Sequence, residues 1–420
     1  MAELPPDPML QLSADPSFHF EILRTMAMTA YEGADLGEVL VAAPQIVPSD
    51  FESFYAAFNA LASRVDKVAQ SIDSKRHPSS ARSMYFKAAT YYASADFYLH
   101  GNWSDDRIYS LWDKHLSAFD AAMALMSLPG TRITLPSKDS EFSIPAIFFS
   151  AGLPGRRPTL IIGNGFDGSQ EEMYHVIGKA ILERGMNVIT YEGPGQPTVR
   201  RKQNCGFIAD WERVVSPVVD WALKQPEIDP KAIGLLGYSL GGYLAPRAAA
   251  FDNRIMAVLA IDGVTDYGRR ALTSYPSDVQ ALYHEGQQQE FDVAATKFFQ
   301  QDNIPTAKRW AYEHGKFSFN TESPFELVTK RMAMNLEGHY DQIQVPVFVA
   351  DADRETSFPG QAKELADALG DRATYRLFTS EEGAGAHCSL GGAVLLNQVA
   401  LDWFEDVLEE KDSRHPCEDL

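Results

Sequence analysis

A Gly-Tyr-Ser-Leu-Gly run at residues 237–241 constrains the fold of this chain more than any other feature. An apolar stretch precedes it and helix-favouring residues follow it, so the sequence predicts a strand, a sharp turn and a helix. The strained turn presses its backbone against both neighbours and needs small residues around the serine, and Gly237 and Gly241 meet that need. Such a turn holds the Ser239 hydroxyl clear of the sheet, which favours a nucleophile over an ordinary turn with a capping serine.

This pattern is the nucleophile elbow of the α/β-hydrolase fold, in which an acid and then a histidine follow the serine, each on a loop after a strand. His387 fits that order, because it lies among small residues between a predicted last strand and a predicted helix. The alternative is a solvent-facing loop histidine. The remaining histidines considered lie on predicted helices or helix ends and are interpreted as ordinary: His100, His115, His175, His284 and His314.

Three carboxylates follow the predicted strand at residues 345–351 and compete for the role of the acid. Counting from the proline that opens this strand, the usual spacing places a small residue at Ala352, the acid at Glu355 and a proline at Pro359. Glu355 is therefore the first choice, since glutamate can hold an imidazole in one tautomer as aspartate does. The alternatives are Asp353, then Asp351, and after them Asp262 behind another strand, which we expect rather in the pocket wall.

The oxyanion hole of such a site takes one N–H from the residue after the nucleophile and one from the loop after the third core strand. Leu240 supplies the first. The glycine-rich loop at residues 163–169 occupies the second place, and its predicted donor is the Phe166 N–H. This loop lacks the lysine of a phosphate-binding loop, and the turn at residues 191–196 lacks the third glycine of a dinucleotide fingerprint.

Two kinds of periodicity divide the 420 residues, which exceed the roughly 250 that one such core needs. Helical stripes fill the N-terminal part, and short strands alternating with helices follow, which predicts a doubly wound, mostly parallel sheet. The predicted strands are 131–135, 143–149, 159–163, 187–192, 233–237, 256–262, 345–351 and 373–378, with a helix at 171–184. The predicted parts are an N-terminal helical cap region (1–130), the first part of an α/β-hydrolase core (131–264), a helical lid insertion (265–340), the second part of the core (341–411) and a loose tail (412–420).

The aromatic stripes of the N-terminal helices are interpreted as packing rather than as substrate contacts. Asp96 is the exception, because a carboxylate stands on a face that looks buried. The candidate substrate-pocket residues are Asp96, Tyr238, Asp262 and Asp167.

The net charge of −20 disfavours nucleic acid and anionic membrane as partners, and a neutral or apolar small molecule fits better. The sequence contains no apolar run long enough for a membrane span, and the first residues do not have the pattern of a secretory signal. Three cysteines without metal-ligand spacing favour a cytoplasmic protein that has no structural disulfide. The sequence implies no metal and no organic cofactor, and it leaves a homodimer open.

The segments 165–169, 192–196, 237–242, 358–361 and 383–388 together resemble the fungal secondary-metabolite α/β-hydrolases. This group includes the yellowish-green pigment enzyme that shortens a heptaketide and is related to the 2,6-dihydroxypseudooxynicotine hydrolases. The resemblance extends to residues 80–82, 91–92 and 95–97 in the N-terminal helices and implies a hydrolase, often of a carbon-carbon bond in a β-diketone. The sequence departs from the family in having Glu355 where aspartate is usual and Pro197 where glycine is common.

The expected function is that of a serine hydrolase that cleaves a carbon-carbon or ester bond of a polyketide-like molecule through an acyl-enzyme. Two alternatives remain at this point. Some relatives are thought to perform cyclisation or condensation on the same scaffold, and some hydrolase-fold proteins only bind their ligands.

Overall fold

One mixed sheet of eight strands forms the centre of the protein in a computed structural model that describes residues 7–414. Its strand order is β1-β2-β4-β3-β5-β6-β7-β8, in which β2 is antiparallel to both of its neighbours and the rest are parallel. The strands are β1 (Thr131–Pro136), β2 (Ser143–Phe149), β3 (Arg157–Gly163), β4 (Asn187–Tyr191), β5 (Ile228–Tyr238), β6 (Ala257–Ile261), β7 (Val347–Ala352) and β8 (Ala373–Phe378). The predicted doubly wound sheet is therefore confirmed, and each predicted strand overlaps one of these eight.

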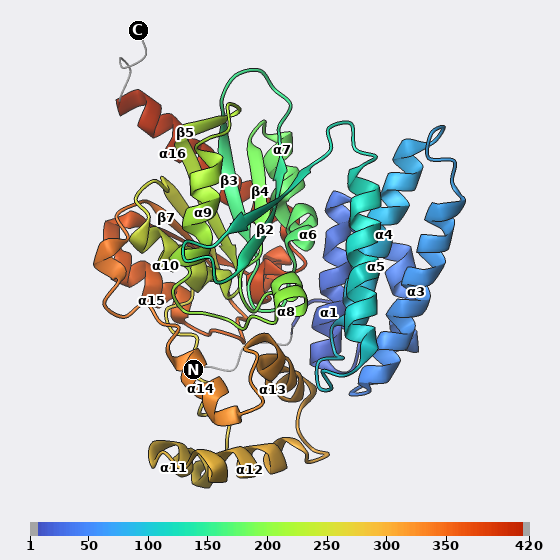
Figure 1. Cartoon of the computed structure of the whole chain (residues 1–420), viewed down its shortest axis with the longest axis vertical. Helices are drawn as coiled ribbons and strands as arrows, with labels where there is room; N and C mark the ends of the chain where they lie inside the picture. The colour runs from blue at the N-terminus through green and yellow to red at the C-terminus, as the bar shows by residue number, and fades with distance from the viewer. Residues whose placement is uncertain (1–6, 415–420) are drawn as a thin grey trace.

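Helices cover both faces of the sheet because the central strands are buried on both sides. Figure 1 shows α9 and α10 on one face and α6, α7 and α16 on the other. With α8 and α15, the helices that connect or follow the strands have these bounds: α6 (Gln170–Met173), α7 (Lys179–Glu183), α8 (Pro197–Gln203), α9 (Glu212–Ala222), α10 (Gly241–Phe251), α15 (Gln361–Leu369) and α16 (Ala393–Arg414).

The helix expected at 171–184 is interrupted by a π-helical turn, η3 (Tyr174–Gly178), where the His175 ring turns toward the Tyr31 carbonyl. Helix α16 continues to Arg414, into the tail expected at 412–420, and the rest of that predicted tail lies outside the described residues.

The N-terminal part is a layer of helices beside the sheet (Figure 1), comprising α1 (Pro16–Ala27), α2 (Leu36–Ala42), α3 (Phe51–Ser71), α4 (Pro78–Asp96) and α5 (Asp106–Met123). Aspartates cap four of them: the carboxylates of Asp15, Asp35, Asp50 and Asp105 accept hydrogen bonds from the first backbone N–H groups. Their buried faces join the apolar residues of one sheet face in a single cluster. The helical layer is therefore packed on the core as part of the same interior.

Four helices lie between β6 and β7: α11 (Ser277–His284), α12 (Gln288–Phe299), α13 (Thr306–Ser318) and α14 (Pro324–Met332). The first two project from one end of the molecule (Figure 1) over a small apolar cluster of their own. Helix α13 differs, because it contacts α1 and α8 and so reaches the junction between the helical layer and the sheet.

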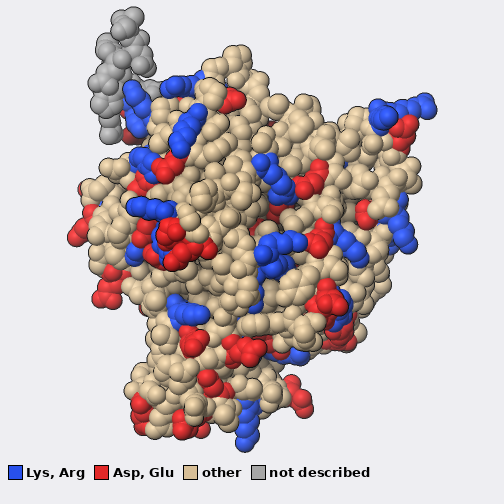
Figure 2. Space-filling model, viewed as in Figure 1, with Lys and Arg blue, Asp and Glu red and all other residues tan. Residues whose placement is uncertain are grey.

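Short helical turns complete the chain: η1 (Met28–Tyr31), η2 (Ala43–Gln45), η4 (Tyr340–Gln342), η5 (Gly370–Arg372), η6 (Ser380–Glu382) and η7 (His387–Ser389). Within residues 7–414, every helix is too short or too polar to cross a bilayer. Lysine and arginine alternate with acidic side chains over the face in Figure 2, so that face presents no extended stripe of one sign.

Candidate active site

Ser239 lies in the turn between β5 and α10, with a backbone φ of 60°. This left-handed conformation is strained for a residue with a side chain. The turn requires Gly237, because a Cβ there would lie 1.9 Å from the Gly241 carbonyl oxygen. The predicted elbow geometry is thus present at the carboxyl end of the central strand.

The imidazole of His387 joins the serine to two carboxylates. Its Nε2 lies 2.8 Å from Ser239 Oγ, and its Nδ1 lies 2.6 Å from Glu355 Oε2. The rings of Phe20 and Phe358 flank it, at centroid distances of 6.3 Å and 5.7 Å. Segments distant in the sequence therefore enclose this histidine.

Glu355 stands on the loop after β7, and backbone donors fix its second oxygen. Its Oε1 accepts the N–H groups of Ser357 and Phe358, the latter at 2.8 Å. Of the three acids expected on this loop, only this one contacts His387. Asp351 accepts hydrogen bonds from the Tyr375 hydroxyl and the Ala352 N–H, whereas Asp353 accepts two from Ser380.

Asp262, which we expected in the pocket wall, instead lies against the catalytic histidine candidate. Its Oδ2 is 2.7 Å from His387 Nδ1 and also accepts the Cys388 N–H. The reason is local: the residue follows β6 with a φ of 60°, and this turn directs its carboxyl group toward β7 and the histidine loop. Its Oδ1 is buried and has no hydrogen-bond partner within the described chain.

Burial, and then the charge of Glu355, raises the pKa of Asp262 to about 7. Burial also acts on Glu355, but the charge and hydrogen bond of His387 outweigh it and lower the pKa of Glu355 to about 2. Burial alone would lower the pKa of His387, yet Cys388, Glu355 and Asp262 together hold it well above its usual range. The histidine therefore faces a Glu355 that is ionised at neutral pH and an Asp262 that takes up a proton far more readily than Glu355 does.

Both predicted oxyanion donors lie beside the serine. A Cβ on Gly165 would come within 2.7 Å of the Leu240 nitrogen and 2.9 Å of Ser239 Cβ, so the Gly165–Phe166 peptide packs directly on the elbow. Within residues 7–414, neither Leu240 N–H nor Phe166 N–H donates to a hydrogen-bond acceptor. Two free donors next to the serine oxygen suit an incipient oxyanion.

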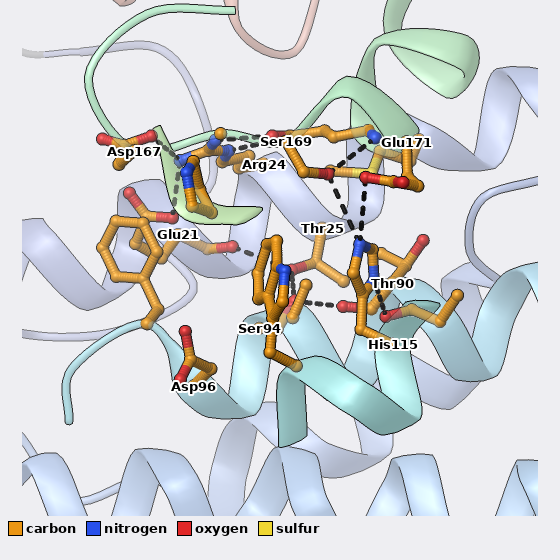
Figure 3. A pocket seen from close by; sticks show the side chains of 18 of the residues that line it. Glu21, Arg24, Thr25, Thr90, Ser94, Asp96, His115, Asp167, Ser169 and Glu171 are labelled. Carbon is orange, nitrogen blue, oxygen red and sulfur yellow. Dashed lines mark hydrogen bonds and ion pairs between the residues drawn. The ribbon is translucent and has the colours of Figure 1, made fainter. Parts of the chain in front are cut away.

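A cavity of about 60 Å³ lies between α1, α4 and α5 and the loop that follows Phe166. Figure 3 shows Arg24 pointing toward Asp167, with His115 close to Ser169 and Glu171. This volume holds a few water molecules. Ser239 and His387 are not among its lining residues, but Asp167 and Gly168 of the oxyanion loop are.

The candidate pocket residues have different surroundings. Asp96 lines this cavity, where its Oδ2 accepts from Arg201 at 2.5 Å and its Oδ1 has no partner among the described residues. Asp167 also lines it and pairs with Arg24 at 2.8 Å. Tyr238 does not, since its hydroxyl donates to the Cys388 carbonyl.

Four of the five histidines interpreted as ordinary are buried and line the cavity: His100, His115, His175 and His314. The Arg201 guanidinium donates to His100 Nε2, so His100 Nδ1 donates to His314 Nδ1 at 3.0 Å, and His314 Nε2 donates to the Phe166 carbonyl at 3.3 Å. This chain of hydrogen bonds could not be predicted from the sequence, because its members come from the turn after α4 and from two separate helices, α8 and α13. His284, at the end of α11, does not line this cavity.

Sequence reasoning also missed Arg24, which contacts Asp167 and Glu172 on the opposite side of the junction. The only feature of the sequence that could have drawn attention to Arg24 is its spacing from Glu21, one helical turn away, with which it forms an ion pair. Asp262, His387 and Cys388 form the one group of possible metal ligands within the described residues. Ser239 and the two carboxylates already engage both nitrogens of His387, so this imidazole has no free lone pair for a metal.

The model of the alpha/beta hydrolase family matches residues 97–393. The chain belongs to this family. Similar proteins are hydrolases from fungi: the 20-hydroxy-prefusarin hydrolase FUS2 of Gibberella moniliformis is 28% identical, over 96% of this chain and 99% of its own length. The hydrolase acrC of Aspergillus aculeatus is also 28% identical, over 94% of this chain and 97% of its own length.

Solved structures show the same fold for this alpha/beta hydrolase. The crystal structure of 2,6-dihydroxy-pseudo-oxynicotine hydrolase matches with a TM-score of 0.69 at 22% identity and covers 91% of this chain and 95% of that one. The alpha/beta hydrolase GrgF from Penicillium sp. sh18 matches with a TM-score of 0.51 at 18% identity, over 66% of this chain and 99% of its own. The expected fold and family resemblance are confirmed.

Proposed function

We propose that this alpha/beta hydrolase is a serine hydrolase that cleaves a carbon-carbon or ester bond of a polyketide-like small molecule. The observation that carries the proposal is the continuous contact from Ser239 Oγ through His387 to the carboxylates of Glu355 and Asp262. A hydroxyl is a weak nucleophile, and a base positioned in this way can take its proton as it attacks. The fungal relatives, one of them a 20-hydroxy-prefusarin hydrolase, support the substrate class.

The reactive form of the enzyme is the one in which His387 is neutral and Nε2 has a free lone pair. In the first half-reaction of this form, the Ser239 hydroxyl gives its proton to His387 Nε2 while Oγ bonds to a substrate carbonyl carbon. The Leu240 and Phe166 N–H groups stabilise the resulting oxyanion. Collapse breaks the bond on the other side of that carbon, and the leaving group takes its electron pair and then the proton from His387. An ester releases an alcohol, whereas a β-diketone releases an enolate whose charge its second carbonyl delocalises.

In the second half-reaction, His387 takes a proton from water, and the hydroxide oxygen bonds to the acyl carbon. The acyl–Oγ bond breaks, and Ser239 recovers its proton from His387. The ionised Glu355 stabilises the imidazolium that forms in both halves. Each step uses only groups that lie in mutual contact around the serine.

The function is tested with 1-phenyl-1,3-butanedione and p-nitrophenyl butyrate in water enriched in oxygen-18. We expect one or both probes to be cleaved, with one heavy oxygen in the carboxylic acid product and no turnover by Ser239→Ala. Turnover without incorporated oxygen, or turnover that survives in Ser239→Ala, would contradict the serine hydrolase and favour ring closure by His387 alone. No turnover, combined with tight binding of the probe, would instead favour a binding protein.

A further inference from the structure

Gln196 follows the turn after β4 and its side chain is fully buried beneath the oxyanion loop. Its Oε1 accepts the Gly193 N–H at 2.8 Å. Its Nε2 donates to the carbonyl oxygens of Asn164, at 2.8 Å, and Gly165, at 3.1 Å. The partners fix the orientation of the amide, because an N–H group needs an acceptor and two carbonyls need a donor.

The Gly165 carbonyl and the Phe166 N–H belong to the same peptide group. A hydrogen bond to the carbonyl end of a peptide polarises it and makes its N–H a stronger donor. Gln196 therefore acts on the predicted oxyanion donor through one peptide plane. It also fixes the direction in which that N–H points.

The opposite side of this peptide has no room to move. A Cβ on Gly165 would lie 2.6 Å from the Tyr238 carbonyl oxygen, so the elbow forms a wall immediately behind it. Asn164 Oδ1 accepts the Gly165 N–H at 2.7 Å. The loop is thus held between the elbow and the buried amide of Gln196.

We propose that Gln196 is a positioning residue that aims and strengthens the Phe166 N–H as an oxyanion donor. This inference rests on the proposed serine hydrolase, since it concerns the same oxyanion hole. It assigns a role to the Glu-Gly-Pro-Gly-Gln segment at residues 192–196, which lacks the third glycine of a dinucleotide fingerprint.

The test compares the rate at which a fluorophosphonate modifies Ser239 in the wild type, Gln196→Met and Gln361→Met. Phosphonylation develops charge on the phosphoryl oxygen in the oxyanion hole, so we expect Gln196→Met to slow it by at least about tenfold. Gln361 is the matched control, because its buried amide likewise ties loop backbone, through Thr265 and Asp266, away from the serine. Gln361→Met should lose about as much thermal stability as Gln196→Met, yet its phosphonylation rate should stay within about twofold of the wild-type rate.

Gln196→Glu provides a second variant with nearly the same shape. It keeps the acceptor for Gly193 N–H, and its carboxyl group can donate to the loop only when protonated. We expect the ratio of its rate to the wild-type rate to rise as the pH falls. A role limited to filling space would leave this ratio constant.

The outcomes separate the two proposals. Equal slowing in Gln196→Met and Gln361→Met, together with a constant ratio for Gln196→Glu, would overturn the role of Gln196 and leave the serine hydrolase intact. A wild-type Ser239 that does not react with the fluorophosphonate would overturn both.

Discussion

Asp262 and Glu355 approach the same nitrogen of one imidazole: His387 Nδ1 lies 2.7 Å from Asp262 Oδ2 and 2.6 Å from Glu355 Oε2. A single N–H cannot fully satisfy two ionised carboxylates. The pKa of about 7 for Asp262, against about 2 for Glu355, makes Asp262 the carboxyl group that takes up a proton first as the pH falls. Two acids from different strands are thus available to one histidine.

The first prediction concerns the division of work between these acids. Glu355→Gln should lower kcat by about 10- to 100-fold only, because losing the charge of Glu355 lets Asp262 ionise and support the imidazolium. The double variant Glu355→Gln/Asp262→Asn should lose about 10⁴-fold. Steady-state kinetics on p-nitrophenyl butyrate measures both. If Glu355→Gln alone were as impaired as the double variant, Asp262 would have no part in supporting His387.

The second prediction concerns Arg24, whose guanidinium bonds to Asp167 at 2.8 Å and to Glu172 at 2.6 Å. Arg24→Met leaves these mostly buried carboxylates facing each other beside the oxyanion loop, and we expect a loss of about 2 kcal/mol in unfolding free energy. We also expect a fall in kcat of about tenfold or more.

Arg184 offers the control for Arg24. It also pairs with two carboxylates, Asp402 and Glu405, but these are 50% and 40% exposed. Arg184→Met should therefore cost at most about 1 kcal/mol and leave kcat unchanged. Equal losses in urea unfolding and in kcat for the two variants would contradict a special role for Arg24.

The third prediction concerns pH-dependent stability. Burial, opposed in part by Arg24, raises the pKa of Glu21 from 4.5 to about 8. The folded protein then keeps a proton that the unfolded chain releases, so stability should fall as the pH rises from about 4.5 to about 8. In the Glu21→Gln variant, the thermal unfolding midpoint should depend less on pH across that range. An unchanged slope in calorimetry would show that Glu21 ionises normally.

The fourth prediction uses the packing of Gly165 against the elbow. Gly165→Ala places a methyl group 2.6 Å from the Tyr238 carbonyl oxygen, which must displace the oxyanion loop. We expect kcat to fall by about 100-fold with a smaller change in KM. Gly37→Ala, on an exposed helix with its nearest contact at 3.4 Å, should leave kcat unchanged. A Gly165→Ala variant with wild-type kcat would show that the Phe166 N–H is not an oxyanion donor.

The sheet could be predicted because its inner strands contain apolar runs bounded by turn residues. β2 and β8 have the predicted bounds, and the elbow at Ser239 follows from local glycine spacing. The π-helical turn was not predictable in this way, since a tertiary contact between His175 and Tyr31 accompanies it and local periodicity does not report such contacts.

The site was predictable only where the order along the chain reports position in space. His387 contacts both Ser239 and Glu355 because each of the three follows the carboxyl end of a parallel strand. Asp262 was undervalued because its approach depends on a left-handed backbone, which the residue pattern around it does not indicate. The histidine chain at the cavity depends on how the turn after α4 meets α13, and no sequence spacing encodes that.

The most direct test of the account is to isolate the covalent intermediate. The enzyme is mixed with p-nitrophenyl butyrate and quenched in acid within milliseconds, and the modified peptide is identified by mass spectrometry. The account predicts a butyryl group on Ser239 that forms with the release of p-nitrophenol and fails to accumulate in His387→Ala. A butyryl group on another residue, or rapid turnover with Ser239 unmodified, would contradict it.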